Sequence, residues 1–342
     1  MRDFRMEILR NNIPIGKLFC KSITIRYDST AEVMRGMQCE AYVDRIEMTE
    51  GFTFDMFSDR LRPVVIEDGE ESSLGTFMII AAPETLSETG SYYNIEAYDE
   101  TMLLKQAALT ARSYFAAGTS YITAIETMLT AVGMANIVAD DNDDTLQINR
   151  EFAVGTSYIS IINTLLEEIN FSPVHAGSDG YIYLTQKTDP VTADFVYKDR
   201  NDFSIIGQIS RDTDIYSKPN VLVGVLSNPQ QSPVTYTRQN TDLNSVLSIG
   251  RRGYQVVKIY KMSNIASSSV LEAYIDAELL KAMQTTETVS FQTLLETGHE
   301  YRSTVQLATD LIEGLFIETG WQIDIRPNQA RMQHNAERRV FV

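Results

Sequence analysis

The chain has few of the residues on which most metal and enzyme sites depend. Its 342 residues include one tryptophan, two cysteines and three histidines. The histidines, His175, His299 and His334, are far apart in the sequence and lie in no recognisable motif. A structural zinc site needs about four ligands, more than these residues readily provide. Cys20 and Cys39 are therefore expected to be buried free thiols in strands, because cytoplasmic thiols stay reduced.

Long apolar segments are also absent. No run of about eighteen apolar residues occurs, so no membrane span is expected. The N-terminal residues, MRDFRMEILRNN, carry scattered charges and lack the apolar region of a secretory signal. We therefore expect the protein to be made in a cytoplasm.

Catalytic motifs are missing as well. The sequence contains no Gly-x-Ser-x-Gly elbow and no glycine-rich phosphate loop with its lysine. The acidic run that begins at Asp140 has the oxygen ligands of a calcium loop, but Thr145 stands where an EF-hand needs glycine. A solvated turn is expected there. The sequence predicts no catalytic, cofactor-binding or metal-binding residue and no cofactor.

A hydrolytic pair of carboxylates stays an open alternative. Glycoside hydrolysis needs two carboxyl groups about 5–10 Å apart, and sequence does not give distances. The chain has 46 acidic residues, which offer many such pairs. A charged surface is the expectation, with a cell-wall hydrolase as the alternative.

The charge is strongly acidic and unevenly distributed. The net charge is −17, whereas proteins that bind nucleic-acid phosphates are normally basic. Residues 40–105 hold fifteen acids and four bases, while residues 1–39 and 326–342 each have a net charge of +3. Two interpretations stay open: a surface that keeps the protein soluble, or an acidic face whose basic ends meet acidic neighbours.

The first hundred residues read mostly as strands. Residues 23–27 (ITIRY) alternate apolar and polar side chains, and Phe52, Phe54 and Met56 mark one face of another expected strand. Residues 60–106 contain further short strands separated by an acidic turn and a polar loop. Short strands at this spacing favour a barrel or sandwich over a parallel sheet.

Two similar helices are expected next. Residues 118–130 (GTSYITAIETMLT) and 155–167 (GTSYISIINTLLE) are identical at eight of thirteen positions. In each copy a hydroxyl residue suited to an N-cap precedes an apolar stripe at helical spacing, and Gly133 is a natural stop after the first. A local duplication and convergent helix-start chemistry both explain the likeness. A hairpin is expected after the second helix, over residues 172–185.

After Asp194 the chain returns to β structure. One helix, at about 268–283, interrupts the strands and carries apolar residues at helical spacing. Trp321, at the start of an expected strand, is assigned to core or interface packing. The expected strands cover residues 194–197, 203–209, 221–226, 233–238, 254–260, 288–295 and 322–326.

The predicted fold class is α+β, mainly β, with two related antiparallel β-barrels and smaller inserted α+β domains. The first barrel is assigned to residues 1–108, completed by strands from about 194–217. Residues 109–193 form the inserted domain with the two similar helices. Residues 218–342 form the second barrel, with a helical insertion near 265–285.

Several short structural motifs occur along the chain in a characteristic order. They are Arg62–Val65, Leu74–Phe77, Glu96–Asp99, Leu104–Gln106, Gly118–Tyr121, Glu151–Phe152 with Gly155–Thr156, Leu165–Phe171, Lys218–Val221 and Arg338–Val340. Each motif is structural, and their shared order gives them weight. Through these motifs, and over most of its length, the chain resembles the tail hub proteins of bacteriophages and phage-like particles, including prophage tail proteins of Gram-positive bacteria.

The resemblance implies an assembly and partners. Hub monomers carry two tube-type barrels, and three monomers form a ring with six barrels, which joins a six-fold tail tube to a three-fold spike or tip. The implied partners are two further copies, the tube or distal tail protein, the spike or tip protein and the tape-measure protein. DNA would pass through the channel without specific binding.

The implied location is a virion or phage-like tail, assembled in the bacterial cytoplasm. An acidic wall would repel phosphate, so part of residues 40–105 is expected to face the channel. The alternatives are a tail-associated cell-wall hydrolase and a carbohydrate-binding tail-tip protein.

Overall fold

A computed structural model describes residues 2–87, 90–188, 191–198, 205–213, 215–226, 234–262, 268–327 and 329–341. The chain divides into two compact units. The first contains Met1–Gln208 and Phe291–Asn335, and the second contains Ile209–Ser290 and Ala336–Val342. Among the helices of the described residues, none is long and apolar enough to cross a membrane.

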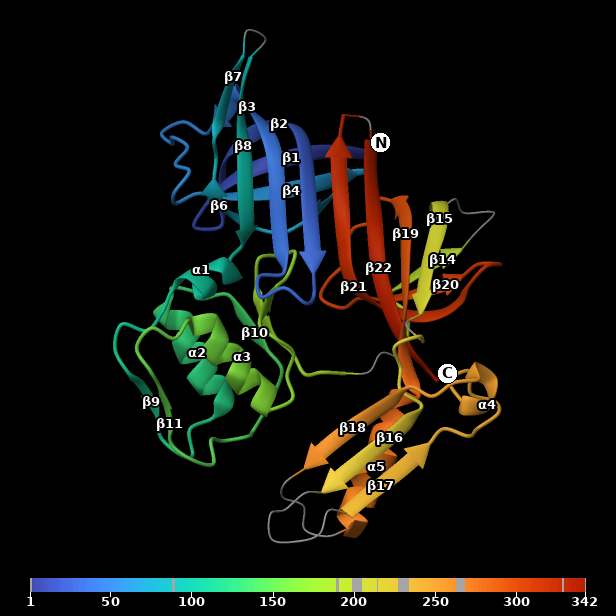
Figure 1. Ribbon diagram of the computed structural model, residues 1–342. Helices are drawn as coiled ribbons and strands as arrows, with labels where there is room; N and C mark the ends of the chain where they lie inside the picture. Colours follow the sequence, from blue (N-terminus) through green and yellow to red (C-terminus); the bar gives the residue numbers. More distant parts are fainter. Residues whose placement is uncertain are drawn as a thin grey trace. The chain divides into compact units, whose positions relative to one another are not determined.

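The N-terminal strands of the first unit close into a barrel (Figure 1). Six of them pair in the order β1-β4-β6-β8-β3-β2, and β1 pairs with β2 to complete the circle. Two short strands extend this barrel, since β5 pairs with β4 and β7 with β8. The strands are β1 (Arg2–Arg10), β2 (Ile13–Asp28), β3 (Arg35–Met48), β4 (Arg60–Glu67), β5 (Glu70–Ser73), β6 (Phe77–Ala81), β7 (Glu84–Ser87) and β8 (Gly90–Asp99).

The period-two pattern explains the barrel core. Ile23, Ile25 and Tyr27 of β2 are buried in a core cluster, as the alternation predicts. The prediction of a strand around Phe52–Met56 is wrong, because residues 52–55 have no regular secondary structure and Met56 begins a turn. The Asp55 carboxylate accepts hydrogen bonds from the backbone N–H of Phe57 (3.0 Å) and the hydroxyl of Ser58 (2.7 Å), which favours a turn over a strand ladder.

A second set of six strands continues the same sheet. Its order is β15-β19-β22-β21-β20-β14. Numbered along the chain within its own set, each set has the lateral order 1-4-5-6-3-2. One pairing differs in direction, since β14 lies parallel to β20 whereas β1 lies antiparallel to β4. The strands are β14 (Phe195–Lys198), β15 (Ile205–Thr213), β19 (Gln284–Leu294), β20 (Thr304–Ala308), β21 (Glu313–Arg326) and β22 (Gln329–Phe341).

The predicted fold class, mainly β with a large antiparallel sheet and smaller α+β parts, is confirmed. Trp321 is buried in the core, as expected, but lies inside β21 and not at the start of a strand. The domain limits at residues 108, 193 and 218 stay predictions. Residues 203 and 204 of an expected strand lie outside the described residues.

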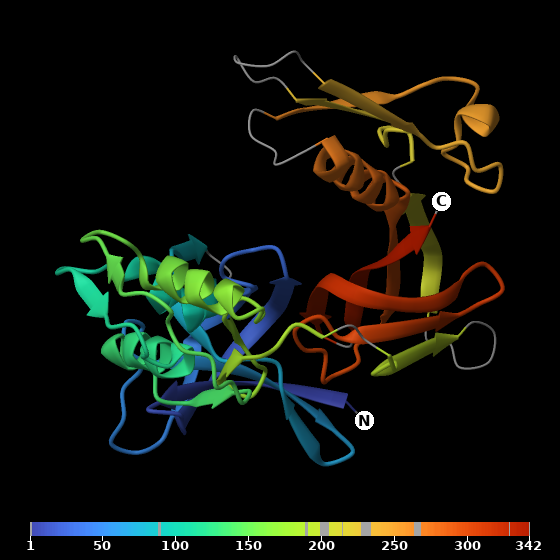
Figure 2. The same cartoon turned by 90° about the horizontal axis from the view of Figure 1, so that it is seen from below.

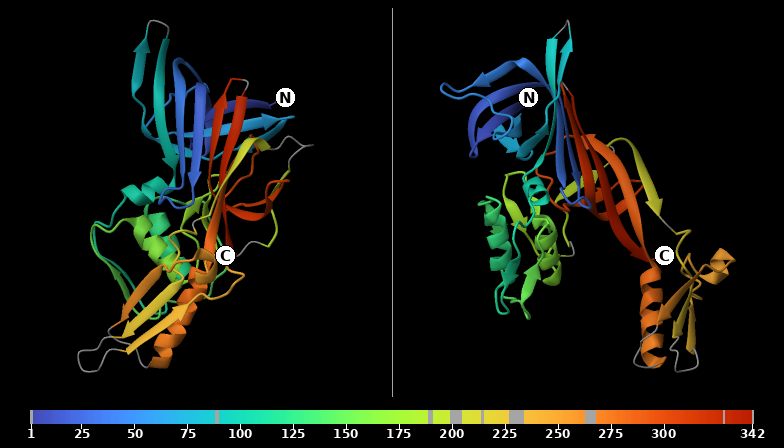
Figure 3. Two further views of the ribbon diagram at one scale, coloured as in Figure 1. Left: turned by 45° about the vertical axis from the view of Figure 1, so that its right-hand side comes forward. Right: turned by 60° about the vertical axis from the view of Figure 1, so that its left-hand side comes forward.

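The inserted part of the first unit contains the two similar helices, which lie side by side (Figure 3). They are α2 (Tyr121–Ala131) and α3 (Tyr158–Glu168), and both confirm the prediction. Around them are α1 (Thr101–Gln106), β9 (Ser113–Phe115), β10 (Ile137–Ala139), β11 (Arg150–Phe152), β12 (His175–Ala176) and β13 (Ile182–Leu184). β12 and β13 form the expected hairpin pairing.

The prediction of hydroxyl N-caps is correct in position but wrong in the hydrogen bond. Ser120 and Ser157 are the N-cap residues, but neither side chain accepts a hydrogen bond from the helix. Carbonyl groups from elsewhere in the chain accept from the first-turn amides, since the N–H of Tyr121 donates to Asp144 O (3.2 Å) and that of Tyr158 to Ala107 O (3.2 Å). The helix starts therefore depend on tertiary contacts.

The second unit contains a small α+β layer. Three strands pair in the order β17-β16-β18, with α5 packed on one face (Figure 2). Gly224 of β16 allows this approach, because a Cβ there would lie 2.7 Å from Ile275 Cγ1 and 2.8 Å from Leu271 Cδ1. The elements are β16 (Val221–Leu226), β17 (Val234–Gln239), α4 (Ile249–Arg252), β18 (Val257–Met262) and α5 (Ser268–Ala282).

The sequence predicted β16 to β18 as strands and α5 as a helix, and the structure confirms these elements. Residue 233, at the start of one expected strand, and residues 265–267, at the start of the expected helical insertion, lie outside the described residues.

Candidate functional site

The feature most suited to a structural role is the junction where β2 of the first set meets β21 of the second. Along one edge, the first half of β2 pairs with β1 as far as Leu18, and residues 23–28 then pair with residues 320–325 of β21. β21 changes partner in the same way, from β20 over residues 313–317 to β2. Each strand therefore belongs to its own set and to the junction.

Aromatic and basic side chains fill this junction. The rings of Tyr27 and Trp321 lie 5.5 Å apart, and the guanidinium of Arg35 lies 5.5 Å from the centre of the Trp321 ring. Gly320 is required here, because a Cβ would lie 2.9 Å from Tyr27 O. The Thr24 hydroxyl also donates to the Asp324 carboxylate (2.8 Å). The two strand sets are therefore joined by backbone pairing, ring packing and a cation–π contact.

Arg35 extends the junction to the inserted α+β part. It is 2% exposed, and its guanidinium is paired with the Glu300 carboxylate. The same carboxylate accepts from the backbone N–H of Ser178 (3.1 Å), beside the β12–β13 hairpin. His175 of that hairpin stacks on Tyr301, with ring centres 4.2 Å apart. The segment 300–301 thus holds the insertion and the first barrel at one place.

Asp99, at the end of β8, fixes the start of β3. Its carboxylate accepts from the backbone N–H of Arg35 (2.8 Å) and of Thr101 (2.8 Å), where α1 begins. Burial raises the pKa of Asp99, although these hydrogen bonds favour its charged form. The side chain therefore ties the end of β8 to both β3 and α1.

A buried polar cluster lies in the second strand set. Nδ1 of His299 and Nδ1 of His334 each lie 2.6 Å from a different oxygen of the Glu318 carboxylate. On the far side, Nε2 of His299 lies 3.0 Å from the Tyr197 hydroxyl, and Nε2 of His334 lies 2.8 Å from Thr293 Oγ1. All five side chains are buried. They form a continuous hydrogen-bonded chain across β14, β19, β21 and β22.

Electrostatics favour neutral rings in this cluster. Burial lowers the pKa of His299 to about 4 and also lowers the pKa of His334, while it raises the pKa of Glu318. Two neutral imidazoles that donate from Nδ1 to Glu318 can accept at Nε2 from the two hydroxyls. The cluster is therefore a cross-link between strands that satisfies its own polar atoms.

This cluster is also the group that comes nearest to a metal site among the described residues. His299, Glu318 and His334 offer ligand atoms within 4.8 Å of one another. An ion bound at about 2.0–2.2 Å would hold these atoms around itself. Here each imidazole instead contacts its own carboxylate oxygen at hydrogen-bond distance, so we interpret the group as a hydrogen-bonded network.

Sequence reasoning treated these histidines as dispersed and did not find the cluster. One signal was present. Glu318 lies two residues after buried Phe316 on β21, so both side chains point to the same, inward face. His334 lies two residues after buried Met332 on β22 and points inward in the same way. Polar residues at inward positions of alternating strands need partners, which indicates a buried network.

The other predicted residues lie apart from the junction contacts. Both cysteines are free thiols in neighbouring strands, as expected; Cys39 is also buried as expected, whereas Cys20 is only half-buried. Asp140 accepts from the backbone N–H of Gln186 (2.8 Å), and Asn142 Oδ1 accepts from that of Asp144 (3.0 Å). The Asn142 contact is local, as in an Asx-turn, whereas the Asp140 contact joins the run to a residue distant in sequence. Asp140, Asp141, Asp143 and Asp144 are exposed, which agrees with the solvated segment that the sequence predicted.

Several acids of residues 40–105 are paired within the first barrel. Glu40 pairs with Lys21, Asp59 with Arg10, Glu71 with Arg5 and Glu100 with Arg60. The acidic turn is a tight hairpin, with positive φ at Asp68 (52°) and Gly69 (93°). The basic N-terminal segment therefore neutralises part of the acidic block inside one barrel.

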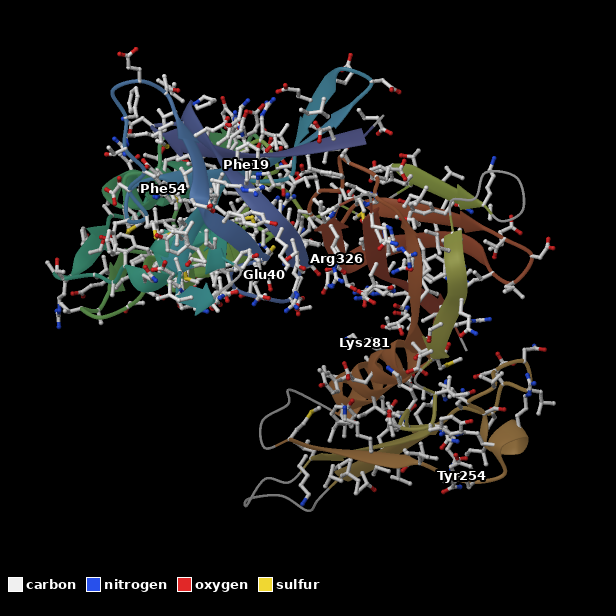
Figure 4. All side chains as sticks on the ribbon, turned by 90° about the horizontal axis from the view of Figure 1, so that it is seen from above. Phe19, Glu40, Phe54, Tyr254, Lys281 and Arg326 are labelled. Atoms are coloured by element: carbon white, nitrogen blue, oxygen red, sulfur yellow. The ribbon has the colours of Figure 1, made fainter. Side chains whose placement is uncertain are left out.

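A groove of about 640 Å³ opens beside the junction, in the first unit. Phe19 and Arg326, labelled in Figure 4, line it together with Lys17 and Leu294. It lies along residues 19–22 of β2, the stretch between the pairing with β1 and the pairing with β21. The groove marks where the two sets separate.

Comparison with known proteins shows what this architecture is similar to. No family model matches the chain, and no curated protein is similar to it in sequence. Solved structures do share its fold. The tail protein from Neisseria meningitidis MC58 has a TM-score of 0.63 at 9% identity, with 98% of this chain and 96% of that chain covered.

Two further structures agree. The 43 kDa tail protein of prophage MuSo2 from Shewanella oneidensis has a TM-score of 0.61 at 7% identity, covering 97% of this chain and 98% of that one. An E. coli component of the type VI secretion system, itself structurally similar to the T4 tail proteins gp27 and gp5, has a TM-score of 0.51 at 8% identity, covering 96% and 76%. The chain has the fold of phage tail proteins, and the resemblance stated from the sequence is confirmed at that level.

Proposed function

We propose that this protein is the structural hub of a phage or phage-like tail, a trimer whose ring joins the tail tube to the spike or tip. The observation that carries the proposal is the repeated strand order, 1-4-5-6-3-2, in two sets joined edge to edge. A ring of three such chains presents six similar units to a six-fold tube and three-fold symmetry to a spike. The likeness to tail proteins supports this role.

The buried contacts fit a structural role. The side chains around Arg35 and Glu300, and the cluster around Glu318, are packed and hydrogen-bonded within the first unit. In this proposal the hub is a non-enzymatic protein that is located in the tail and assembled in the bacterial cytoplasm.

The acidic charge fits a channel that polyanions cross without binding. Pairs within the barrel use Glu40, Asp59, Glu71 and Glu100, and the remaining acids of residues 40–105 leave that block strongly negative. Phosphate groups are repelled by such a wall. We propose that part of this block lines a channel for DNA or the tape-measure protein, and a neutral or basic channel in the trimer would refute this.

A mass measurement in solution followed by electron-microscopy class averages tests the proposal. The expected result is a trimer mass and a ring with an open pore. A monomer at every concentration tested, both alone and with the tube and spike proteins, would refute the hub assignment.

The alternative is a tail-associated hydrolase, because buried and paired carboxylates occur in this chain. A zymogram on purified peptidoglycan separates the two. Clearing of the peptidoglycan by the purified protein would contradict the purely structural role.

A further inference from the structure

We propose that the ring closes through β15 of one copy and the β6–β7 edge of the next copy. The inference rests on the proposed trimeric ring and names the surfaces that form its contact. It follows from the repeated strand order. Within one chain, the second strand of the first set (β2) lies against the fifth strand of the second set (β21).

The same contact can be made between chains. The second strand of the second set is β15, and the fifth strand of the first set is β6. If all six junctions in a three-chain ring are alike, β15 of each copy meets β6 of its neighbour. This is a heterologous contact between two different surfaces, and in the proposed trimer its repetition around the three-fold axis closes the ring.

The β6 edge matches β21 in detail. β21 and β22 form a long hairpin. In the first set, β6 and β7 follow each other along one edge of β8 and form with it the corresponding long hairpin (Figure 1). β21 pairs with β20 only over residues 313–317 before it turns to β2. β6 likewise pairs with β4 only at Phe77 and Met78. In each set the fifth strand leaves its fourth-strand neighbour early.

The rest of the β6–β7 edge is available. Beyond Met78, residues 79–87 pair with β8 along one edge, and no second strand in the described part of the chain pairs with them. Ile80 is 39% exposed and Leu86 is 73% exposed. A strand laid along this edge would cover apolar surface and pair open backbone groups. In the chain itself, β2 does this for β21.

β15 has the features expected of the strand that would bind there. It ends the strand order of the sheet, and Gly207, Gln208, Ser210 and Asp212 are all exposed. Ile209 is half-buried. By contrast, Ile23, Ile25 and Tyr27, in the half of β2 that pairs with β21, are buried. In the part of the chain that the structure describes, β15 pairs with β19 along one edge, whereas its counterpart β2 also pairs with β21 along the other.

Cross-linking tests the contact in the full-length chain. Thr85→Cys on β7 and Ser210→Cys on β15 place thiols on the two proposed surfaces, both at exposed positions. A short bismaleimide should link copies of this double variant into covalent dimers and trimers. The control joins Thr85→Cys with Thr237→Cys on β17, an exposed position off the proposed contact. It should stay monomeric on a denaturing gel.

A second pair of variants measures the apolar contribution. Leu86→Lys puts a charge into the proposed contact, whereas Leu311→Lys changes a comparably exposed leucine (79%) away from it. Since burying a leucine contributes enough to change an affinity about tenfold, Leu86→Lys should weaken trimer formation about tenfold or more. Leu311→Lys should leave the trimer dissociation constant unchanged.

The outcomes separate this inference from the proposed function. A trimer mass without cross-links above the control level, or equal effects of the two lysine variants, refutes the β15–β6/β7 contact and leaves the ring intact. A chain that is monomeric throughout refutes the ring and this contact together. Cross-links that occur in the trimer fraction, and are lost with Leu86→Lys, support the contact.

Discussion

Acid should destabilise the first unit through His175, and the effect can be derived from the structure. His175 is 6% exposed, its Nδ1–H donates to Pro173 O (2.9 Å), and its ring stacks on Tyr301. Burial, the largest cause, lowers its pKa from 6.5 to about 4. In the unfolded chain the imidazole takes up a proton near pH 6.5, whereas in the folded protein it stays neutral until about pH 4.

The sign follows from proton binding. Between these two pKa values the unfolded state holds more protons, so the free energy of unfolding falls as the pH is lowered. His175 contributes its full stabilisation above pH 6.5 and loses it towards pH 4. At pH 4.5 the loss is about 2.5 kcal/mol, because each pKa unit corresponds to about 1.4 kcal/mol.

Urea unfolding of the wild type and His175→Phe at about pH 7 and about pH 4.5 measures this loss. Phenylalanine keeps the stacking on Tyr301 but cannot be protonated. Other groups titrate equally in both proteins, so the difference between the two pH dependences isolates His175. The variant should lose about 2.5 kcal/mol less than the wild type on acidification. Equal losses would show that His175 is not buried in its neutral form.

Three further outcomes are expected. Gly224→Ala should destabilise the second unit by about 1–3 kcal/mol, measured by urea unfolding, because the new methyl group crowds Ile275 and Leu271. Glu318→Leu should lower the free energy of unfolding by several kcal/mol, on the order of 3 or more, since two buried imidazoles lose their acceptor; an unchanged urea midpoint would contradict the cross-link. The neighbouring Cys39 side chain, and after it burial, hold the pKa of Cys20 well above its usual range, so native Cys20 should react with iodoacetamide more slowly than in urea, and equal rates would contradict this.

Local patterns predicted the elements whose own residues determine them. The alternation at Ile23, Ile25 and Tyr27 identified a core strand, and the repeated Gly-Thr-Ser-Tyr segments located α2 and α3 to within a few residues. Phe52 and Met56 misled the prediction, because Asp55 uses its carboxylate to hold a turn. One short side chain outweighed the apolar spacing around it.

Contacts between distant strands could not be read in the same way. The cluster of His299, Glu318 and His334 requires the register of β21 and β22 to be known, because a shift of one residue would turn each side chain to the other face. Histidine spacing along the chain carries none of this information. The buried cluster therefore became visible only with the fold.

The two strand sets are alike in the order of their strands and not in their amino-acid sequences. The sets share no recognisable sequence, and residues 214–283 separate the second strand of the second set from its third. The first strands even differ in direction, because β14 runs parallel to the fourth strand of its set whereas β1 runs antiparallel to the fourth strand of its own. What persists is the lateral order and the early departure of the fifth strand from the fourth. Pairing order depends on backbone hydrogen bonds, which almost any alternating sequence can make. The second and fifth strands, which form the edges between sets, therefore occupy the same positions in both sets although their side chains differ. For this reason we infer the proposed contact between copies from the strand order.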